Sequence, residues 1–207
     1  MKQPDLTKPD SIKLGSRALK SNPNPETLKF SRKNPYHAEL LERIKLNGEG
    51  SAKETIHLEF KLEESALTYE AGDSLAVLAH NADDVVKDLI TLTGLSPDSL
   101  VQIKDESVTL LDALTCQLDI TTLSASVIKR YNEIVDNKEL ENLLKPENKP
   151  DLQKYIDGRE IIDLLHKYPA YDISADSLIS IMRKLPARLY SIASSPKVHP
   201  EEVHLTV

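Results

Sequence analysis

The chain has 207 residues, a formal net charge of -7 and a single cysteine. This length is sufficient for one sizeable hydrophobic core or two small ones. The acidic balance argues against a nucleic-acid or anionic-membrane surface, because such surfaces need clustered positive charge and no run of basic residues is longer than two. A lone cysteine, Cys116, excludes an internal disulfide and a thiolate metal cluster, so we expect a reducing, cytoplasmic location.

The beginning of the chain shows no periodicity. Residues 1–30 are polar and rich in Lys, Asn and Pro, and they lack the apolar segment of a signal peptide. We expect a disordered N-terminal arm here. No apolar run anywhere in the sequence approaches the roughly 18 residues that a membrane span requires.

Strand patterns follow between residues 31 and 80. An alternating segment, 38–46, ends at the turn sequence Asn47-Gly48-Glu49-Gly50. In residues 55–62 every second position is apolar, which predicts a half-buried antiparallel strand. A third strand is predicted over 74–79, after the Gly72-Asp73 turn.

The periodicity becomes helical from Asn81 to about Leu185, where leucine and isoleucine recur at the spacing of helix core positions. The predicted helices are 82–93, 107–116, 122–135, 138–144, 151–156, 160–167 and 175–183. Strands therefore flank a long helical block. This order predicts an α+β protein in which helices are inserted into an antiparallel sheet.

A short strand near the end of the chain carries the most informative residues, Arg188-Leu189-Tyr190-Ser191, within an alternating stretch over 187–195. On a strand, Arg188 and Tyr190 project from one face, roughly 7 Å apart. A guanidinium binds phosphate oxygens and a phenol ring offers a stacking surface, so the pair fits a ligand with phosphate and an aromatic ring system. Ser191 points the other way and could contribute through its backbone N–H. The same four residues also fit an ordinary strand whose arginine is solvated and whose tyrosine packs on the core.

Several segments together extend this pattern. Residues 188–195 run on to Val203-His204-Leu205-Thr206-Val207, and upstream lie residues 34–36, residues 54–60 and Tyr69-Glu70-Ala71-Gly72-Asp73-Ser74-Leu75-Ala76-Val77. In this order they resemble the FAD-binding module of the ferredoxin–NADP reductase-like family. The resemblance is closest to the diflavin reductases, which include the sulfite reductase flavoprotein alpha subunit and the NADPH–cytochrome reductases. One departure is Ala71, which stands where that family usually has proline.

The resemblance implies an incomplete antiparallel FAD-binding β-barrel with an inserted all-helical connecting domain. Residues 31–80 would form the first part of the barrel, 81–186 the helical insertion, and 187–207 the barrel strands that carry the arginine–tyrosine motif. It also implies roles at the cofactor: Arg188 would neutralise FAD phosphate, Tyr190 would stack on the flavin, and Ser191 would hydrogen-bond near its hydride-accepting nitrogen. Backbone contacts are implied for Leu189, Thr206 and Val207.

Two further positions have weaker implications. Arg159 lies at a predicted helix start, where the macrodipole disfavours a cation, and where the family often places an arginine near the cofactor. Of the two explanations for Arg159, a surface salt bridge is favoured over a phosphate. Asp119 lies in a segment similar to an adenosine-side contact of the family, and we do not count it among the candidate site residues.

By resemblance, the intact enzyme takes hydride from NADPH onto FAD and passes electrons, through FMN where that domain exists, to an acceptor such as the sulfite reductase hemoprotein. Only six glycines are present, and none forms a G-x-G-x-x-G or P-loop sequence. We therefore expect NADPH to bind outside this chain. The resemblance implies that FMN also binds through a domain absent from the chain and that the chain stops before the family's pyrophosphate loop, so we expect the fragment alone to be inactive. Two alternatives stay open: electron transfer of the NADPH–cytochrome reductase type, and a non-catalytic helical scaffold with a vestigial flavin site.

Other chemistries find little support in the sequence. None of the six histidines falls in an H-x₃-H helical spacing, so we expect no metal site. No nucleophile elbow of the G-x-S-x-G type is present, and no pair of carboxylates stands out as acid and base. We therefore assign no catalytic residue.

Overall fold

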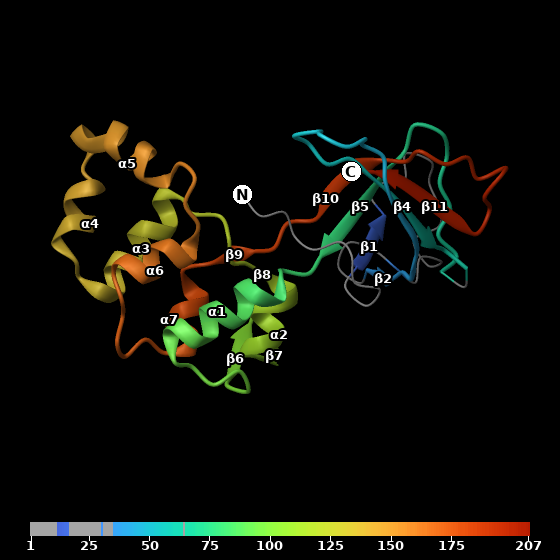
Figure 1. Cartoon of the computed structure of the whole chain (residues 1–207). Coiled ribbons are helices and arrows are strands. Elements are labelled where there is room, and N and C mark those ends of the chain that lie inside the picture. The colour runs from blue at the N-terminus through green and yellow to red at the C-terminus, as the bar shows by residue number, and fades with distance from the viewer. Residues whose placement is uncertain (1–11, 17–29, 31–34, 64) are drawn as a thin grey trace. The chain divides into compact units, whose positions relative to one another are not determined.

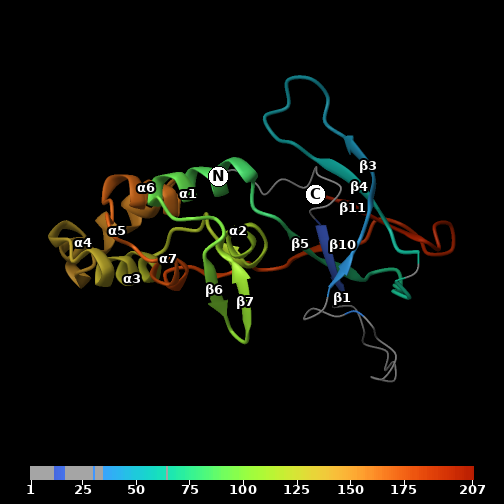
Figure 2. The same ribbon diagram turned by 90° about the horizontal axis from the view of Figure 1, so that it is seen from below.

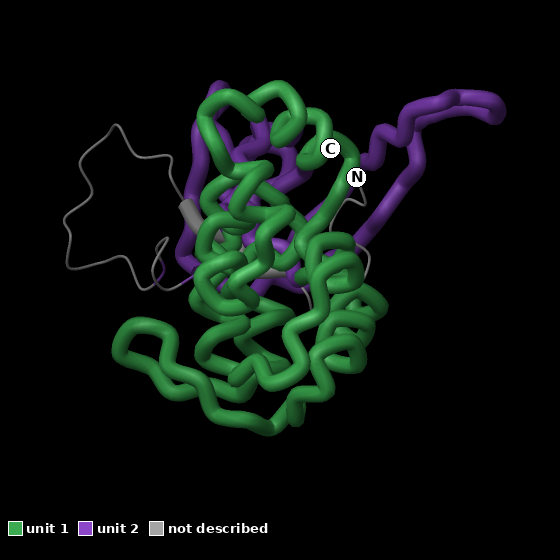
Figure 3. Tube along the Cα trace, turned by 90° about the vertical axis from the view of Figure 1, so that its left-hand side faces the viewer, with its two compact units in different colours: residues 1–4, 81–185 green, residues 5–80, 186–207 purple. Residues whose placement is uncertain are grey.

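The computed structural model describes residues 12–16, 30, 35–63 and 65–207. Figures 1 and 2 show the helices and strands from two directions. The chain divides into two compact units, which Figure 3 colours separately. Unit 1 contains Asn81–Leu185, and unit 2 combines the described residues up to His80 with Pro186–Val207.

Unit 2 consists of antiparallel strands in two sheets. The first sheet has the order β10-β5-β1-β2 and the second has the order β11-β4-β3. The isolated bridge between Ile192 and Leu205 connects the end of β10 to β11. The strands are β1 (Ile12–Ser16), β2 (Tyr36–His37), β3 (Leu40–Lys45), β4 (Ile56–Lys61), β5 (Ser74–Ala79), β10 (Arg188–Ser191) and β11 (Glu202–Thr206).

Strand β4 shows why this sequence folds as a sheet. Ile56, Leu58 and Phe60 are buried, whereas the residues between them are only partly covered, as the period of two in the sequence predicts. The core of unit 2 takes further apolar side chains from the neighbouring strands. Its buried members are Ala38, Ile56, Leu58, Phe60, Leu62, Leu75, Val77, Val203 and Leu205.

A tight turn leads into β5. The Asp73 amide donates to the Glu70 carbonyl at 3.1 Å, and the Glu70 amide donates to the Asp73 carboxylate at 2.9 Å. Gly72 has a φ of 96°, in the left-handed region that glycine adopts without strain. The Gly-Asp pair therefore serves as the turn that the sequence predicted.

Unit 1 is mainly helical. Ser124 begins α3 by accepting a hydrogen bond from the Val127 amide, and Gly94 ends α1 in the left-handed conformation. The helices are α1 (Asp83–Thr93), α2 (Leu110–Asp112), a π-helical turn (Ala113–Gln117), α3 (Ala125–Val135), α4 (Lys138–Leu143), a 3₁₀ turn (Pro146–Asn148), α5 (Lys149–Ile156), α6 (Ile161–Lys167) and α7 (Ala175–Ser180). None of these described helices is long and apolar enough to cross a membrane.

Unit 1 also contains strands, which corrects the expectation of an all-helical insertion. β6 (Leu100–Ile103) and β7 (Glu106–Thr109) form a hairpin, visible in Figure 2, and β8 (Leu118–Asp119) pairs with β9 (Arg183–Lys184). The helix predicted over 107–116 is therefore wrong at its start, because the first residues pair with β6. Helix α7 ends at Ser180, before the predicted end at residue 183, because Arg183 enters the β8–β9 pair.

The other helices and strands follow the predictions closely, and the α+β class is confirmed. Two further expectations need correction. The strands of unit 2 form two sheets and do not close into a barrel within the described residues. Strand β1 lies inside the segment 1–30 that we expected to be a disordered arm, since pairing with β5 and β2 supplies its backbone hydrogen bonds. The rest of that segment, apart from Phe30, lies outside the described residues.

Candidate functional site

Strand β10 presents the predicted arginine and tyrosine on one face. Arg188 lies opposite Val77 of β5, and Tyr190 lies opposite Leu75. Tyr190 is half-buried and packs against the core of unit 2. Arg188 is exposed, and within the described part of the chain its side chain makes no hydrogen bond or ion pair. The ring is thus held by packing, whereas the guanidinium is free to bind an anion.

The backbone of β10 also has groups directed away from its partner strand. The Ala193 amide donates to the His204 carbonyl of β11 at 2.8 Å. Backbone groups alternate in direction along an antiparallel strand. Leu189 and Ser191 lie four and two residues before Ala193. Their N–H groups therefore point in the same direction as that of Ala193, away from β5 and toward the side of β11.

The other two predicted site residues are Thr206, the last residue of β11, and Val207, which follows it. Their backbone groups differ in the strand that they face. The Val207 amide donates to the Ile56 carbonyl at 2.9 Å, and the Ile56 amide donates back to the Val207 carbonyl at 2.8 Å. Both backbone groups of Val207 are therefore engaged by β4. Thr206 is exposed and lies two residues after His204, so its backbone groups point toward β10, as those of His204 do. Ser191 lies opposite Thr206 across the bridge.

A hydrogen-bond network that we did not predict ties the turn before β5 to these strands. The Tyr69 hydroxyl lies 2.6 Å from Ser194 Oγ and donates to the Glu202 carbonyl at 3.1 Å. Ser194 Oγ in turn accepts from the His204 amide at 3.0 Å. Tyr69 and Ser194 both lie in segments that support the family resemblance, but the contact joins residues far apart in the sequence, so no local pattern could reveal it.

The candidate site residues on β10 and β11 are Arg188, Tyr190, Ser191 and Thr206, with Arg188 and Tyr190 on one face of β10 and Ser191 opposite Thr206 across the bridge. They combine a cation without a partner among the described residues, a ring fixed by packing, and backbone N–H groups of β10. A guanidinium binds phosphate and a phenol ring stacks on a flat heterocycle. The residues present therefore fit a ligand such as FAD, which carries a pyrophosphate and a tricyclic ring.

Arg159 has a different role from the one we expected. Its guanidinium donates to the Tyr155 carbonyl at 2.7 Å and lies 4.9 Å from the Tyr155 ring centre. Tyr155 is in the last turn of α5, where exposed carbonyls favour a cation. Arg159 thus stabilises the end of the preceding helix, and no phosphate is needed to explain it. The surface salt bridge that we considered is not formed with any described residue.

Asp119 is part of the internal structure of unit 1. The residue is buried, and its carboxylate accepts hydrogen bonds from Thr121, Thr122 and Arg183. Burial alone would raise the pKa of Asp119, but the hydrogen bonds from Thr122, Arg183 and Thr121 outweigh it and hold the pKa below its ordinary value. These bonds within the protein explain the position of Asp119 without a ligand.

Comparison with known proteins identifies the family of the chain. The sequence model of the family described as FAD binding domain matches residues 28–207. The chain therefore belongs to the FAD-binding domain family, whose cofactor is FAD.

Its curated relatives carry a more specific name. The chain is 43% identical over 180 residues to the sulfite reductase [NADPH] flavoprotein alpha-component of Bacillus subtilis (strain 168), covering 86% of this chain and 30% of the relative. The proteins of the same name from Mannheimia succiniciproducens and Photobacterium profundum are each 39% identical over 178 residues, which is 86% of this chain and 29% of each relative. The chain thus spans less than a third of the length of these relatives.

Proposed function

We propose that the chain is the FAD-binding portion of an NADPH-dependent flavoprotein reductase that passes electrons from NADPH via FAD to a sulfite reductase. The observation that carries this proposal is the exposed Arg188, unpartnered among the described residues, beside the packed Tyr190 at the position of the family's flavin motif. The names of the relatives support the choice of acceptor, since they are flavoprotein components of NADPH-dependent sulfite reductase.

In this proposal the site residues hold the cofactor. Arg188 binds a phosphate through its guanidinium, and Tyr190 offers its ring as a stacking surface that the core already orients. Ser191 and Leu189 present backbone N–H groups, with the Ser191 hydroxyl as a further donor, and Thr206 faces the same junction. Because the backbone N–H and C=O of Val207 are both hydrogen-bonded to Ile56, Val207 can contact the cofactor only through its side chain and the second lone pair of its carbonyl oxygen. Bound FAD supplies the redox chemistry, and the protein supplies its position.

The remaining parts of the proposal concern the wider enzyme. We assign unit 1 to the inserted connecting domain of diflavin reductases and the strands of unit 2 to part of the FAD-binding barrel. NADPH and FMN belong to other domains of the family, and the partner is a sulfite reductase hemoprotein. We keep a cytoplasmic location in the proposal, because a single cysteine allows no internal disulfide.

Flavin binding by the purified chain tests the first part. FAD is added to the protein, unbound FAD is removed by dialysis, and flavin absorbance near 450 nm is measured, a wavelength at about which bound flavin is expected to absorb. We expect a yellow protein with one FAD per chain. A well-folded protein that stays colourless would contradict the proposal and support the scaffold alternative.

A chimaera tests the acceptor. Residues 28–207 replace the matching segment of the Bacillus subtilis relative, and NADPH-dependent sulfite reduction is measured with that relative's hemoprotein. We expect activity, and we expect less activity when the chimaera carries Arg188→Ala. If the chimaera binds FAD but reduces only a cytochrome acceptor, the sulfite reductase assignment is wrong while the flavin site stands.

A further inference from the structure

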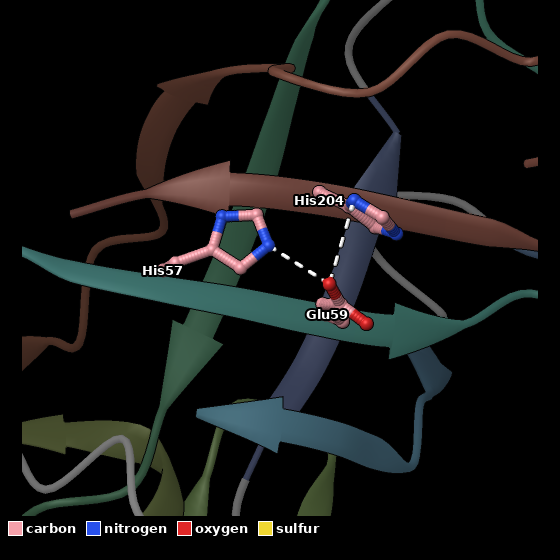
Figure 4. Close-up of side chains that lie close together, drawn as sticks. All are labelled: His57, Glu59 and His204. Carbon is pink, nitrogen blue, oxygen red and sulfur yellow. Dashed lines mark hydrogen bonds and ion pairs between the residues drawn. The ribbon is translucent and has the colours of Figure 1, made fainter. Parts of the chain in front are cut away.

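Three metal-ligating side chains converge on the outer face of the β11-β4-β3 sheet. His57 and Glu59 alternate with the buried residues of β4, so both point away from the core. His204 of β11 lies directly opposite Glu59 in the strand register. Figure 4 shows the three side chains turned toward one another, with the Glu59 carboxylate between the two imidazoles.

The distances between their ligand atoms match a chelating site. Glu59 Oε1 lies 2.9 Å from His57 Nε2 and 3.7 Å from His204 Nδ1. The three ligand atoms all lie within 4.8 Å of one another. Donors around a tetrahedral zinc ion at about 2.0–2.2 Å are roughly 3.3 Å apart, so small side-chain rotations would close this set around an ion. We propose that His57, Glu59 and His204 bind a divalent transition metal ion of the zinc class.

The donor set selects the class of ion. Two imidazoles and one carboxylate are the ligands of many zinc sites that keep a further position open to water. Calcium and magnesium prefer oxygen ligands alone. The side chains of His57 and Glu59 are 21% and 22% exposed, so an ion can enter from solvent, whereas the side chain of His204 is 9% exposed and held firmly.

A fourth residue orients one of the imidazoles. Glu202 Oε2 lies 2.9 Å from His204 Nε2. This contact holds the ring of His204 with its other nitrogen, Nδ1, on the side of Glu59. Carboxylate–histidine–metal arrangements of this kind are typical of protein metal sites.

The charge on the neighbouring strand also favours a cation. Glu42 of β3 lies directly opposite Glu59, on the other side from His204. Like charges opposite each other on a sheet face are destabilising. A bound dication would offset this repulsion.

Calorimetric titration of the purified chain with Zn²⁺ at about pH 7, where free histidine is mostly neutral, tests the proposal. We expect saturable binding of one ion, and a visible Co²⁺ spectrum typical of a site with nitrogen and oxygen ligands. His57→Gln and Glu59→Gln should each weaken Zn²⁺ binding by about tenfold or more, and Glu202→Gln by about tenfold. His166→Gln, which removes an exposed histidine of α6, is the matched control and should bind as the wild type does.

Three outcomes would overturn the assignment. The first is absence of saturable Zn²⁺ binding by a folded wild-type chain. The second is loss of binding in Cys116→Ser, which removes the chain's only thiol. The third is loss in His199→Gln with retention in His57→Gln, because His199, Glu202 and His204 form a second group of ligand atoms within 4.8 Å. None of these measurements depends on flavin, so the metal site and the proposed function can fail separately.

Discussion

Arg183 holds Asp119 through two nitrogens, since Nε and Nη2 both lie 2.9 Å from Asp119 Oδ2. The pair joins β8 to β9, which are adjacent only because the chain returns after several helices. The Asp119 carboxylate is buried, while the Arg183 side chain is 59% exposed. The pair therefore fastens the last strand of unit 1 to its interior, shortly before the chain leaves this unit for β10.

Replacing Asp119 by Asn should lower the free energy of unfolding by about 2 kcal/mol, because buried donors lose a charged acceptor. The folded state lowers the pKa of Asp119, so its contribution is fully present above the unfolded pKa of about 3.9 and is lost as the pH falls through the lower folded value. Urea denaturation measured from neutral pH downward checks this. The difference between wild type and Asp119→Asn should shrink in acid. Asp172→Asn, an exposed control, should be nearly neutral.

Replacing Arg188 by Ala should weaken FAD retention more than replacing Tyr190 by Phe. The first change removes the cation for a phosphate, whereas the second keeps the ring that packs on the core and loses only a hydroxyl. FAD dissociation constants measured by fluorescence check the ranking. Lys53→Ala removes an exposed charge from the loop before β4 and should leave FAD affinity unchanged. Equal constants for Arg188→Ala and Tyr190→Phe would contradict the phosphate-binding role of the arginine.

Replacing Tyr69 by Phe should reduce both stability and FAD affinity. The hydroxyl joins Ser194 and the Glu202 carbonyl, and its loss should cost about 1 kcal/mol. Because Ser194 also accepts from the His204 amide, loosening this network should disturb the junction of β10 and β11. Urea denaturation and FAD titration are the measurements. The control is Tyr171→Phe, at a tyrosine that is 89% exposed. Equal effects of the two changes would show that the Tyr69 hydrogen bonds contribute neither to stability nor to FAD affinity.

Replacing Asn81 by Leu should strongly destabilise unit 1. Asn81 is buried, and its Nδ2 donates to the carbonyls of Leu114 and Leu118 at 2.6 and 2.7 Å. Without this donor two buried carbonyls lose a partner, for a cost of about 2–3 kcal/mol. Thermal denaturation followed by helical circular dichroism checks the loss. In contrast, Asn148→Ala removes a single exposed hydrogen bond and should change little.

The regular segments of this fold could be predicted from the sequence because their signals are local. The alternation over 55–62 gives β4, and the apolar spacing of α1, α3 and α6 gives helices within a few residues of the predicted bounds. The β6–β7 hairpin was missed because its two-residue loop is Lys104-Asp105, without the glycine that usually marks such a turn. Lys104 adopts a φ of 56°, in the left-handed region, which is uncommon for a residue other than glycine, asparagine or aspartate.

The candidate flavin site could be predicted in part, since Arg188, Tyr190 and Ser191 lie within one short motif. The contacts that depend on strand register could not. Val207 is engaged by Ile56, and Tyr69 reaches Ser194, through pairings that no short segment reveals. The proximity of His204 to His57 and Glu59 depends in the same way on the register of β4 and β11, so the sequence could not reveal it.

The way unit 2 is divided along the chain affects how it folds. The strands β8 and β9 and all helices of unit 1 lie between β5 and β10, so unit 1 can complete its pairing as soon as residue 185 has left the ribosome. Strands β4 and β5 can pair early with β3 and β1, but each must wait for its second partner, β11 or β10, which follows unit 1 along the chain. Contacts between segments so distant in sequence form slowly and leave apolar strands exposed in the meantime. During biosynthesis, the candidate flavin site on β10 and β11 can therefore form only after the whole of unit 1 has been synthesised.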